Sequence, residues 1–255
     1  MALAKDIDRL RRMGIYSYAR YRRRRISNRF LRVANLVGPR SYECPCCGWS
    51  GAHFLNHVRE TYWMRGAVCP RCRSHPRHRG LTLHLRRVLP ALRPGAAILH
   101  FAPERSLAPV FRSFPRLHYV AADLGPRAIS VSADTTAIPF RGGTFDLVLS
   151  SHVIEHVEND RAALAEIARV TAPGGQAMIM APMLPEWASQ ETVDFGFPNP
   201  AEDGHYRIYG RDFSSRIAAA GLRCEVTTFA ALIATERRVR CGVADGPIFI
   251  GRKPV

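Results

Sequence analysis

The chain has 255 residues, of which 47% are hydrophobic, and it carries a formal net charge of +16. This length accommodates one large α/β domain with a small appended module, and no stretch approaches the roughly 18 apolar residues that cross a bilayer. The N-terminus is charged but lacks the apolar run of a signal peptide, so we expect a cytoplasmic protein.

Positive charge is concentrated in the first part of the chain. Residues 1–95 contain 21 Lys or Arg and 4 Asp or Glu, whereas residues 96–255 contain 16 and 17. This change of composition predicts a domain boundary at Pro94-Gly95. We expect a basic helical segment over 1–40, a cysteine-rich module with a linker helix over 41–94, and a larger domain over 95–255.

The basic segment has the pattern of an amphipathic helix. Apolar residues recur at spacings of three and four over residues 1–36, among twelve Lys or Arg that precede residue 41, and Gly14 predicts a break. One interpretation is a solvated charged face that docks on the body. The other is an anionic partner, either nucleic acid or a membrane surface, because clustered cations displace phosphate counterions or approach acidic lipid. A membrane partner would make the protein membrane-peripheral.

Two cysteine pairs follow the basic segment. Cys44-x-x-Cys47 and Cys69-x-x-Cys72 are separated by 21 residues, and two such knuckles can supply four thiolates to one tetrahedral zinc ion. Four thiolates leave no open coordination position, so we expect a structural zinc rather than a catalytic one. Unrelated reduced cysteines are the alternative. Three further residues could replace a ligand: Cys46, His75 and His78.

Residues 95–255 alternate between strand-like and helix-like segments. This alternation predicts an α/β fold with a doubly wound, mostly parallel sheet. The predicted strands are residues 96–102, 118–124, 145–151, 175–182, 224–230 and 247–253. The predicted helices are residues 105–114, 160–170 and 211–222. Ligands of such sheets bind beyond the carboxyl ends of the strands.

Two aspartates occur at such strand ends. Asp123 ends the second strand about 20 residues after the exit loop of the first, where a carboxylate can accept hydrogen bonds from a ribose diol. Asp134 follows a short third strand, where the acid or its neighbouring amide can meet an adenine amino group. Each residue also has a simpler interpretation, because Asp123 can cap a helix and Asp134 can stabilise a turn.

The sequence His152-x-x-Glu155-His156 directly follows the strand at 145–151. It has the spacing of an inverted zinc-protease motif, in which two histidines hold the metal and the glutamate is the general base. Here the motif lies at the exit of a buried strand rather than within a long helix, and Glu166 is the only nearby candidate for a third ligand. We therefore do not expect a metalloprotease.

Residues 131–182 contain an ordered set of short motifs. An acid, an Ile-Pro-Phe segment, Phe-Asp-x-Val, the His-x-x-Glu-His helix start and a Pro-Gly-Gly turn follow one another. In this order they resemble the middle of a class I S-adenosylmethionine-dependent methyltransferase, and the likeness spans about residues 96–251. The chain is most similar to a subgroup with an N-terminal four-cysteine zinc knuckle and a segment like that at 203–210.

The resemblance implies a seven-stranded Rossmann-like methyltransferase sheet with S-adenosylmethionine as cofactor. It departs from the family at the first strand, where Ala102 and Pro103 stand in place of a glycine-rich turn. Ala102 is small enough for close approach, Glu104 could accept the cofactor's ammonium group, and Pro103 lacks an N–H donor. The residues expected to bind the cofactor are Phe101, Ala102, Glu104, Asp123, Leu124, Asp134, Thr135 and Ser151.

Methyl transfer to a hydroxyl requires a group that removes its proton. The candidates are His152 at the pocket mouth and His205 with Tyr209 in the later segment, since an imidazole of ordinary pKa suits this task. The alternative for His152 is a residue that orders the start of the helix.

The sequence leaves three functions open. The first is a methyltransferase acting on an unidentified small-molecule or carbohydrate acceptor, with the basic segment as a membrane anchor. The second is an RNA methyltransferase that binds phosphates through the zinc module and residues 71–80. The third is a nucleic-acid-binding zinc module on an inactive body.

Overall fold

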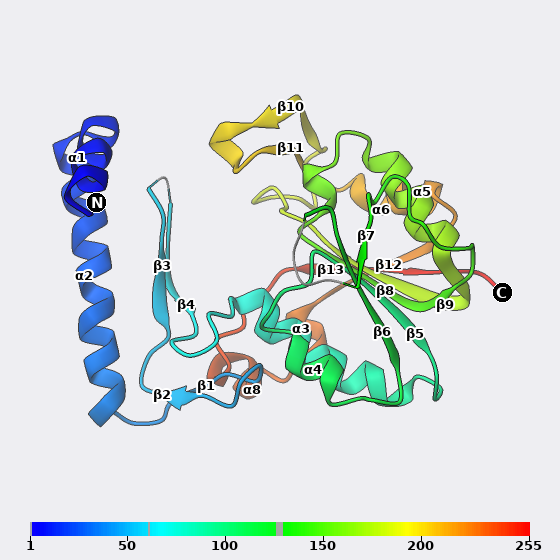
Figure 1. The fold of residues 1–255 in the computed structure, drawn as a ribbon, viewed down its shortest axis with the longest axis horizontal. Helices are drawn as coiled ribbons and strands as arrows, with labels where there is room; N and C mark the ends of the chain where they lie inside the picture. Colours follow the sequence, from blue (N-terminus) through cyan, green and yellow to red (C-terminus); the bar gives the residue numbers. More distant parts are fainter. Residues whose placement is uncertain (1, 61, 126–129) are drawn as a thin grey trace. The chain divides into compact units, whose positions relative to one another are not determined.

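The chain folds into two compact units in a computed structural model, which describes residues 2–60, 62–125 and 130–255 (Figure 1). The first unit comprises residues 1–85 and 233–244, and the second comprises residues 86–232 and 245–255. The division into these two units therefore differs from the single boundary that the sequence predicted at Pro94-Gly95. Residues 233–244 join the first unit because their arginines and carbonyl groups bind side chains of the cysteine-rich module.

Two helices begin the first unit. Helix α1 (Ala2–Met13) and helix α2 (Ile15–Val37) are separated at Gly14, whose φ of 74° is accessible to glycine and costly for other residues. The amphipathic helix and its break are both as predicted. Asn28 of α2 accepts a hydrogen bond from the Asn56 N–H and donates one to the Asn56 carbonyl, which fastens α2 to the following hairpin.

Short strands and two further helices complete this unit. Hairpins pair antiparallel strands, and helix α3 continues from the second cysteine pair. The elements are β1 (Tyr42–Glu43), β2 (Ser50–Gly51), β3 (Leu55–Val58), β4 (Trp63–Val68), α3 (Pro76–Val88) and α8 (Thr235–Arg240). Glu43 forms ion pairs with Arg237 and Arg240 of α8, which brings residues 233–244 to the module.

Arg79 is fully buried in the centre of the first unit. Its guanidinium donates to the carbonyl oxygens of Cys241, Gly242, Ala67 and Ser74 at 2.6–3.0 Å, and it lies 3.9 Å from the centre of the Phe54 ring. The guanidinium thereby joins distant parts of the chain. Its donors are committed to these carbonyl groups rather than to an external phosphate.

The second unit is built around a seven-stranded sheet with the order β12-β13-β9-β8-β5-β6-β7. Strands β5 to β9 pair in parallel, and β13 is antiparallel to both of its neighbours. The doubly wound, mostly parallel seven-stranded sheet is confirmed. Its strands are β5 (Ala97–Phe101), β6 (His118–Asp123), β7 (Val131–Ser132), β8 (Phe145–Ser151), β9 (Thr171–Met180), β12 (Arg223–Thr228) and β13 (Pro247–Arg252).

Helices cover both faces of this sheet. Figure 1 shows α5 and α6 on one face and α4 on the other. Apolar side chains such as Leu99, Val148 and Ile179 are fully buried between the layers. The helical elements are η1 (Leu89–Ala91), α4 (Ala108–Arg112), η2 (Ile154–His156), α5 (Asp160–Val170), η3 (Pro200–Glu202), α6 (Phe213–Ala219) and α7 (Phe229–Leu232).

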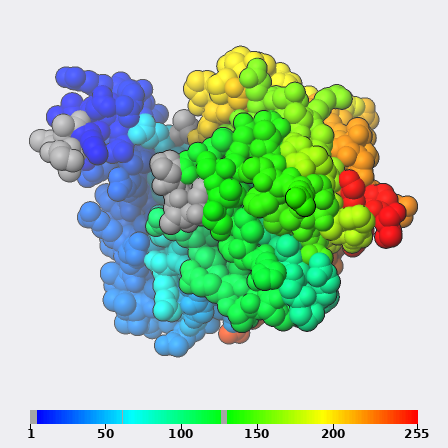
Figure 2. Space-filling view, turned by 45° about the vertical axis from the view of Figure 1, so that its right-hand side comes forward, coloured from blue at the N-terminus to red at the C-terminus, as the bar shows by residue number. Residues whose placement is uncertain are grey.

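A two-stranded hairpin is inserted between β9 and α6. Its strands are β10 (Val193–Asn199) and β11 (His205–Ile208), and β11 packs against η2. In Figure 2 the hairpin (yellow) lies at the surface beside green residues of the same unit. Arg207 donates to the carbonyl oxygens of Val157 and Glu158, so the hairpin is fastened to the segment that follows η2.

Candidate functional site

A pocket of about 190 Å³ opens at the carboxyl ends of β5, β6 and β8. This is the edge of a doubly wound sheet at which ligands bind. Its lining residues are Phe101, Ala102, Ala122, Asp123, Leu124, Ala133, Thr135, His152, Val153, His156 and Val157. Five of the eight residues predicted to bind the cofactor and one predicted catalytic residue, His152, are among them.

Ala102 occupies the turn that follows β5. Its φ is 44°, in the left-handed region that favours glycine, and its N–H donates to the Ala122 carbonyl at 2.8 Å. The chain therefore takes a glycine-type conformation where the methyltransferase resemblance predicts glycine. With only a methyl side chain, Ala102 lets the backbone line the pocket closely.

Asp123 and Leu124 line the pocket at the end of β6. One carboxylate oxygen of Asp123 accepts the Leu124 N–H at 2.8 Å, which orients the side chain. Asp134 has a different role, because its Oδ1 accepts the N–H and hydroxyl of Thr136 at 2.8 Å each. These bonds stabilise a turn, and it is Thr135 that lines the pocket.

Glu104 and Ser151 lie outside the lining set. Glu104 Oε2 lies 2.9 Å from His100 Nε2, and His100 Nδ1 lies 3.0 Å from the Tyr119 hydroxyl. Burial, and then the charge of Glu104, raises the pKa of Tyr119, so this hydroxyl stays protonated. The structure thus holds Glu104 through His100, a buried residue that the sequence pattern gave no reason to select. Ser151 is buried at the end of β8.

His152 and Glu155 form a pair at the pocket. His152 has a φ of 56°, and its Nδ1 lies 3.2 Å from Oε1 of the fully buried Glu155. Since Nδ1 faces the carboxylate, Nε2 is the nitrogen left for a proton transfer. The carboxylate favours the tautomer that is protonated at Nδ1 and unprotonated at Nε2.

The inverted zinc-protease arrangement is absent from the described residues. His152 is not part of the ligand group around Glu155, and the motif lies on the short 3-10 turn η2. Glu166, the nearby candidate for a third ligand, instead binds Arg169 and the Ile138 N–H.

His205 and Tyr209 follow the β10–β11 hairpin turn. His205 approaches His156 edge to face, with ring centroids 4.8 Å apart, and burial lowers its pKa, which favours the neutral imidazole. Tyr209 is fully buried, and its hydroxyl donates to Asp160 at 3.2 Å. The structure therefore places Tyr209 in the packing between β11 and α5, outside the pocket lining.

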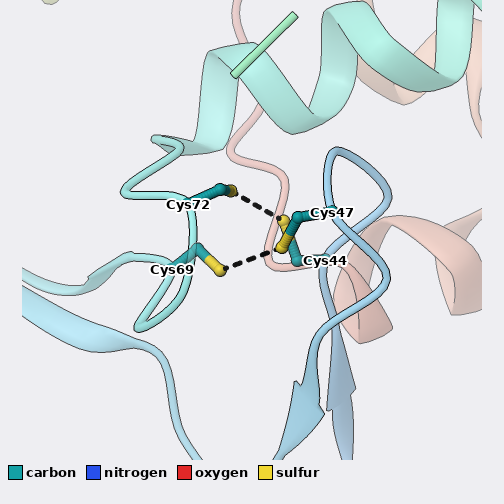
Figure 3. A group of neighbouring side chains, drawn as sticks. All are labelled: Cys44, Cys47, Cys69 and Cys72. Atoms are coloured by element: carbon teal, nitrogen blue, oxygen red, sulfur yellow. Dashed lines mark hydrogen bonds between the residues drawn. The ribbon is translucent and has the colours of Figure 1, made fainter. Parts of the chain in front are cut away.

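The four predicted metal ligands Cys44, Cys47, Cys69 and Cys72 converge in the first unit (Figure 3). Two Sγ pairs, Cys44 to Cys72 and Cys47 to Cys69, are 3.6 and 3.7 Å apart. Thiolates about 2.3 Å from one tetrahedral zinc ion are about 3.8 Å from one another. The spacing of these sulfur atoms therefore fits a zinc ion.

Neighbouring groups favour the thiolate form, which zinc requires, at two of the four cysteines. Hydrogen bonds lower the pKa of Cys44 to about 6, with Cys46 contributing most, and also lower the pKa of Cys72, with Cys44 contributing most. In contrast, burial raises the pKa of Cys47 to about 11, and a hydrogen bond with Cys44 raises that of Cys69. Cys46 lies outside the ligand group and contacts Thr82 at 3.1 Å. Neither His75 nor His78 belongs to the group.

Residues 106–179 match the family model described as a methyltransferase domain. This segment is therefore similar to a methyltransferase domain. It begins two residues before α4 and ends at the penultimate residue of β9, and it contains Asp123, Thr135 and His152. The surrounding sheet, with its antiparallel β13, has the Rossmann-like methyltransferase fold.

Part of the chain is similar to curated relatives. The chain is 40% identical over 62 residues to a demethylmenaquinone methyltransferase of Streptomyces avermitilis, which is 24% of this chain and 27% of that protein. The chain thus matches about a quarter of the length of this curated relative.

Two solved structures share the fold. One is a chain from the Haloferax volcanii complex of the Trm112 methyltransferase activator with a methyltransferase, at TM-score 0.51, 17% identity and coverage of 70% of this chain and 91% of that one. The other is Burkholderia thailandensis 1,6-didemethyltoxoflavin-N1-methyltransferase with 1,6-didemethyltoxoflavin and S-adenosylhomocysteine bound, at TM-score 0.50, 16% identity and coverage of 70% and 78%.

Proposed function

We propose that the protein is an S-adenosylmethionine-dependent methyltransferase that acts on a hydroxyl group, or another nucleophile, of a small-molecule or carbohydrate acceptor. The observation that supports this most directly is the pocket at the carboxyl ends of β5, β6 and β8. Its lining includes Ala102, and also Asp123, Thr135 and His152 from the segment that matches a methyltransferase domain.

The pocket residues suit this cofactor. Asp123 would accept hydrogen bonds from the ribose diol, and Leu124 and Thr135 would contact the adenine. Ala102 would let the backbone approach the methionine part, while Glu104, held by His100, would attract the ammonium group. When bound, S-adenosylmethionine supplies an electrophilic methyl group on a positively charged sulfur.

The chain's own contribution to the reaction is to position the acceptor and remove its proton. His152 would accept the hydroxyl proton at Nε2, because Nδ1 faces Glu155 at 3.2 Å. The buried carboxylate of Glu155 would stabilise the imidazolium that forms. The apolar lining of Phe101, Val153 and Val157 would exclude water from the pocket.

Calorimetric titration with S-adenosylhomocysteine tests the cofactor site. We expect micromolar binding to the zinc-loaded protein and at least a tenfold weaker affinity for Asp123→Ala, because about 1.4 kcal/mol of lost hydrogen bonding is a factor of ten. The matched control is Glu225→Ala, an exposed acid on β12. Equal affinity in Asp123→Ala, or no binding by the folded wild type, would reject the proposed function.

We also propose that Cys44, Cys47, Cys69 and Cys72 bind a structural zinc ion. Support comes from the sulfur spacing and from the small size of the apolar cluster that includes these cysteines, whose buried members among the described residues are Cys44, Cys46, Phe54 and Cys69. Elemental analysis should find this zinc in the wild type and in Cys224→Ser. It should be lost in Cys69→Ser, together with resistance of the first unit to proteolysis.

Finally, we propose that α2 binds an anionic membrane surface. Ile26, Phe30, Val33 and Val37 form an apolar stripe at helical spacing and are 42–88% exposed. Arginines lie along the same helix, and Arg22, Arg25, Arg29 and Arg32 line a groove of about 880 Å³. An apolar stripe beside cations is typical of an interfacial helix, whereas phosphate binding by nucleic-acid proteins needs no such stripe.

Vesicle sedimentation tests the membrane proposal. The wild type should sediment with vesicles containing phosphatidylglycerol and not with pure phosphatidylcholine. The double variant Phe30→Ser/Val33→Ser should lose this binding, whereas Tyr16→Ser, a change at an exposed residue outside the stripe, should retain it. Vesicle binding unchanged by the double variant, or preferential binding to single-stranded RNA, would contradict the proposal.

A further inference from the structure

Glu155, His156 and His205 bring three potential metal ligands together in the second unit. One ligand atom of each side chain lies within 4.8 Å of the other two. Two imidazoles and one carboxylate form a donor set that binds divalent zinc or iron and leaves coordination positions open for a substrate. This cluster is separate from the four cysteines, which belong to the other unit.

The carboxylate of Glu155 is unusual for a buried group. Its side chain is fully buried, and neither oxygen accepts a hydrogen bond from the part of the chain that the structure describes. Oε1 lies 3.2 Å from Nδ1 of His152. Because buried carboxylates are normally hydrogen-bonded, paired or bound to metal, a second partner is expected on the side of His156 and His205.

His205 provides a second buried polar atom that lacks a hydrogen-bond partner among the described residues. Its Nδ1 is inaccessible to solvent and forms no hydrogen bond to a described residue. One ring nitrogen of the hairpin and both carboxylate oxygens of Glu155 on η2 therefore lack hydrogen-bond partners among the described residues. Buried polar atoms of this kind are costly in a folded protein unless a further group binds them.

The fold holds the two segments together. Asp203 and Gly204 have φ values of 54° and 83° and turn the chain into β11 immediately before His205. Two residues later, Arg207 binds the carbonyl oxygens of Val157 and Glu158 and the carboxylate of Asp194. This arginine fixes β11 directly beside the residues that follow His156.

We propose that Glu155, His156 and His205 bind a divalent transition-metal ion at the edge of the pocket. His156 also lines the pocket that contains His152, so an open coordination position of the ion would face the acceptor. Ligands about 2.0–2.1 Å from the ion lie about 3.4 Å apart in a tetrahedral site, so binding would draw the three atoms closer together.

The role of the ion rests on the proposed methyltransferase function. It would hold the acceptor oxygen and lower the pKa of its hydroxyl group. The hydroxyl proton would pass to Nε2 of His152, the oxygen would bond to the methyl carbon, and the carbon–sulfur bond would break with its electron pair remaining on sulfur. Coordination to the ion would favour acceptors that chelate a cation, namely compounds with two neighbouring oxygen donors.

Co²⁺ titration of the zinc-loaded protein, followed by visible absorption, tests the metal site. Co²⁺ binds more weakly than Zn²⁺, so it should not displace zinc from the four cysteines, and any thiolate-bound Co²⁺ would show sulfur-to-metal charge-transfer absorption. We expect one additional Co²⁺ per chain with nitrogen and oxygen ligands. The affinity should fall at least tenfold in His205→Ala and in His156→Ala.

Two histidine variants, His156→Ala and His118→Ala, distinguish loss of the metal site from loss of the fold. His156 is exposed, so its replacement should leave the fold intact, and circular dichroism with zinc content verifies this. His118→Ala, an exposed histidine at the other end of the parallel strands, should bind Co²⁺ like the wild type. No additional Co²⁺ in the wild type, or unchanged binding by folded His156→Ala, would overturn the proposal.

This experiment is independent of methyl transfer. Co²⁺ binding requires neither S-adenosylmethionine nor an acceptor, so absence of the metal site would leave the cofactor pocket untouched. Conversely, failure to bind S-adenosylhomocysteine would remove the methyltransferase role while the metal site could still be measured.

Discussion

Nδ1 of His152 lies 3.2 Å from Oε1 of Glu155, a carboxylate that is fully buried beside the pocket. The pair joins the end of β8 to η2. It orients the His152 imidazole so that the other ring nitrogen, Nε2, is available to accept a proton. His152 also has a φ of 56°, a conformation that few residues adopt without cost. Backbone strain of this kind is often found at functional sites.

If His152 is the general base, its loss should impair methyl transfer and spare cofactor binding. We expect His152→Asn to lower incorporation of labelled methyl groups into a small-molecule extract by about 100-fold to 10,000-fold, since asparagine tolerates the left-handed backbone. The affinity for S-adenosylhomocysteine should stay within a factor of two, as it should in the control His118→Ala. Weaker cofactor binding with normal transfer at saturation would instead show that His152 orders the loop.

Ala102→Gly should stabilise the second unit. An L-residue in the left-handed region costs about 1–2 kcal/mol, whereas the greater freedom of glycine in the unfolded chain offsets about 0.4–1 kcal/mol. We therefore expect a gain of up to about 1 kcal/mol in the free energy of unfolding, measured in urea, with cofactor affinity retained. In contrast, Ala122→Gly on β6 should destabilise the protein. A loss of more than 1 kcal/mol in Ala102→Gly would show that the turn is not strained.

Replacement of Arg79 should destabilise the first unit severely. Arg79→Met leaves four carbonyl oxygens without their donor, and unsatisfied buried groups cost about 1–3 kcal/mol each, so we expect at least about 3 kcal/mol. The measurement is urea unfolding followed by circular dichroism, with the exposed Arg65→Met as the control. A change below 1 kcal/mol would mean that the buried guanidinium is dispensable.

Glu166 should contribute stability that depends on pH. A hydrogen bond from Arg169 is the main cause that lowers the pKa of this carboxyl below its ordinary value. Its contribution is therefore present above the unfolded pKa of about 4.3 and is lost as pH falls through the lower, folded pKa. Glu166→Gln should lower the melting temperature at pH 7 and have a smaller effect at pH 3. An equal effect at both values would contradict this assignment.

Local patterns in the sequence predicted much of the second unit. The helix at 160–170 and the strand at 145–151 have the bounds that their apolar periodicity indicates. Asp146, at the start of that strand, accepts the Ala97 N–H and pairs with Arg93. These features depend on neighbours in the chain or in adjacent strands, so short-range patterns are sufficient to identify them.

Features that depend on distant contacts were not predictable. Arginine is rarely buried, so nothing in the sequence distinguished Arg79 from the exposed Arg71 and Arg73. Nor did it show that residues 233–244 would join the unit that contains Arg79. Likewise, the approach of His205 to His156 depends on the Arg207 contacts of the inserted hairpin. The His-x-x-Glu-His spacing could not show that His205 approaches Glu155 and His156.

None of the helices in the described part of the chain is both long enough and apolar enough to span a bilayer.

The most direct test of the central claim is a crystal structure of the zinc-loaded protein with S-adenosylhomocysteine. The account predicts the ribose hydroxyls within hydrogen-bond distance of the Asp123 carboxylate, the adenine beside Thr135, and the sulfur directed toward the side of the pocket formed by His152 and His156. A fully occupied ligand outside this pocket, or no ligand at a saturating concentration, would contradict the account.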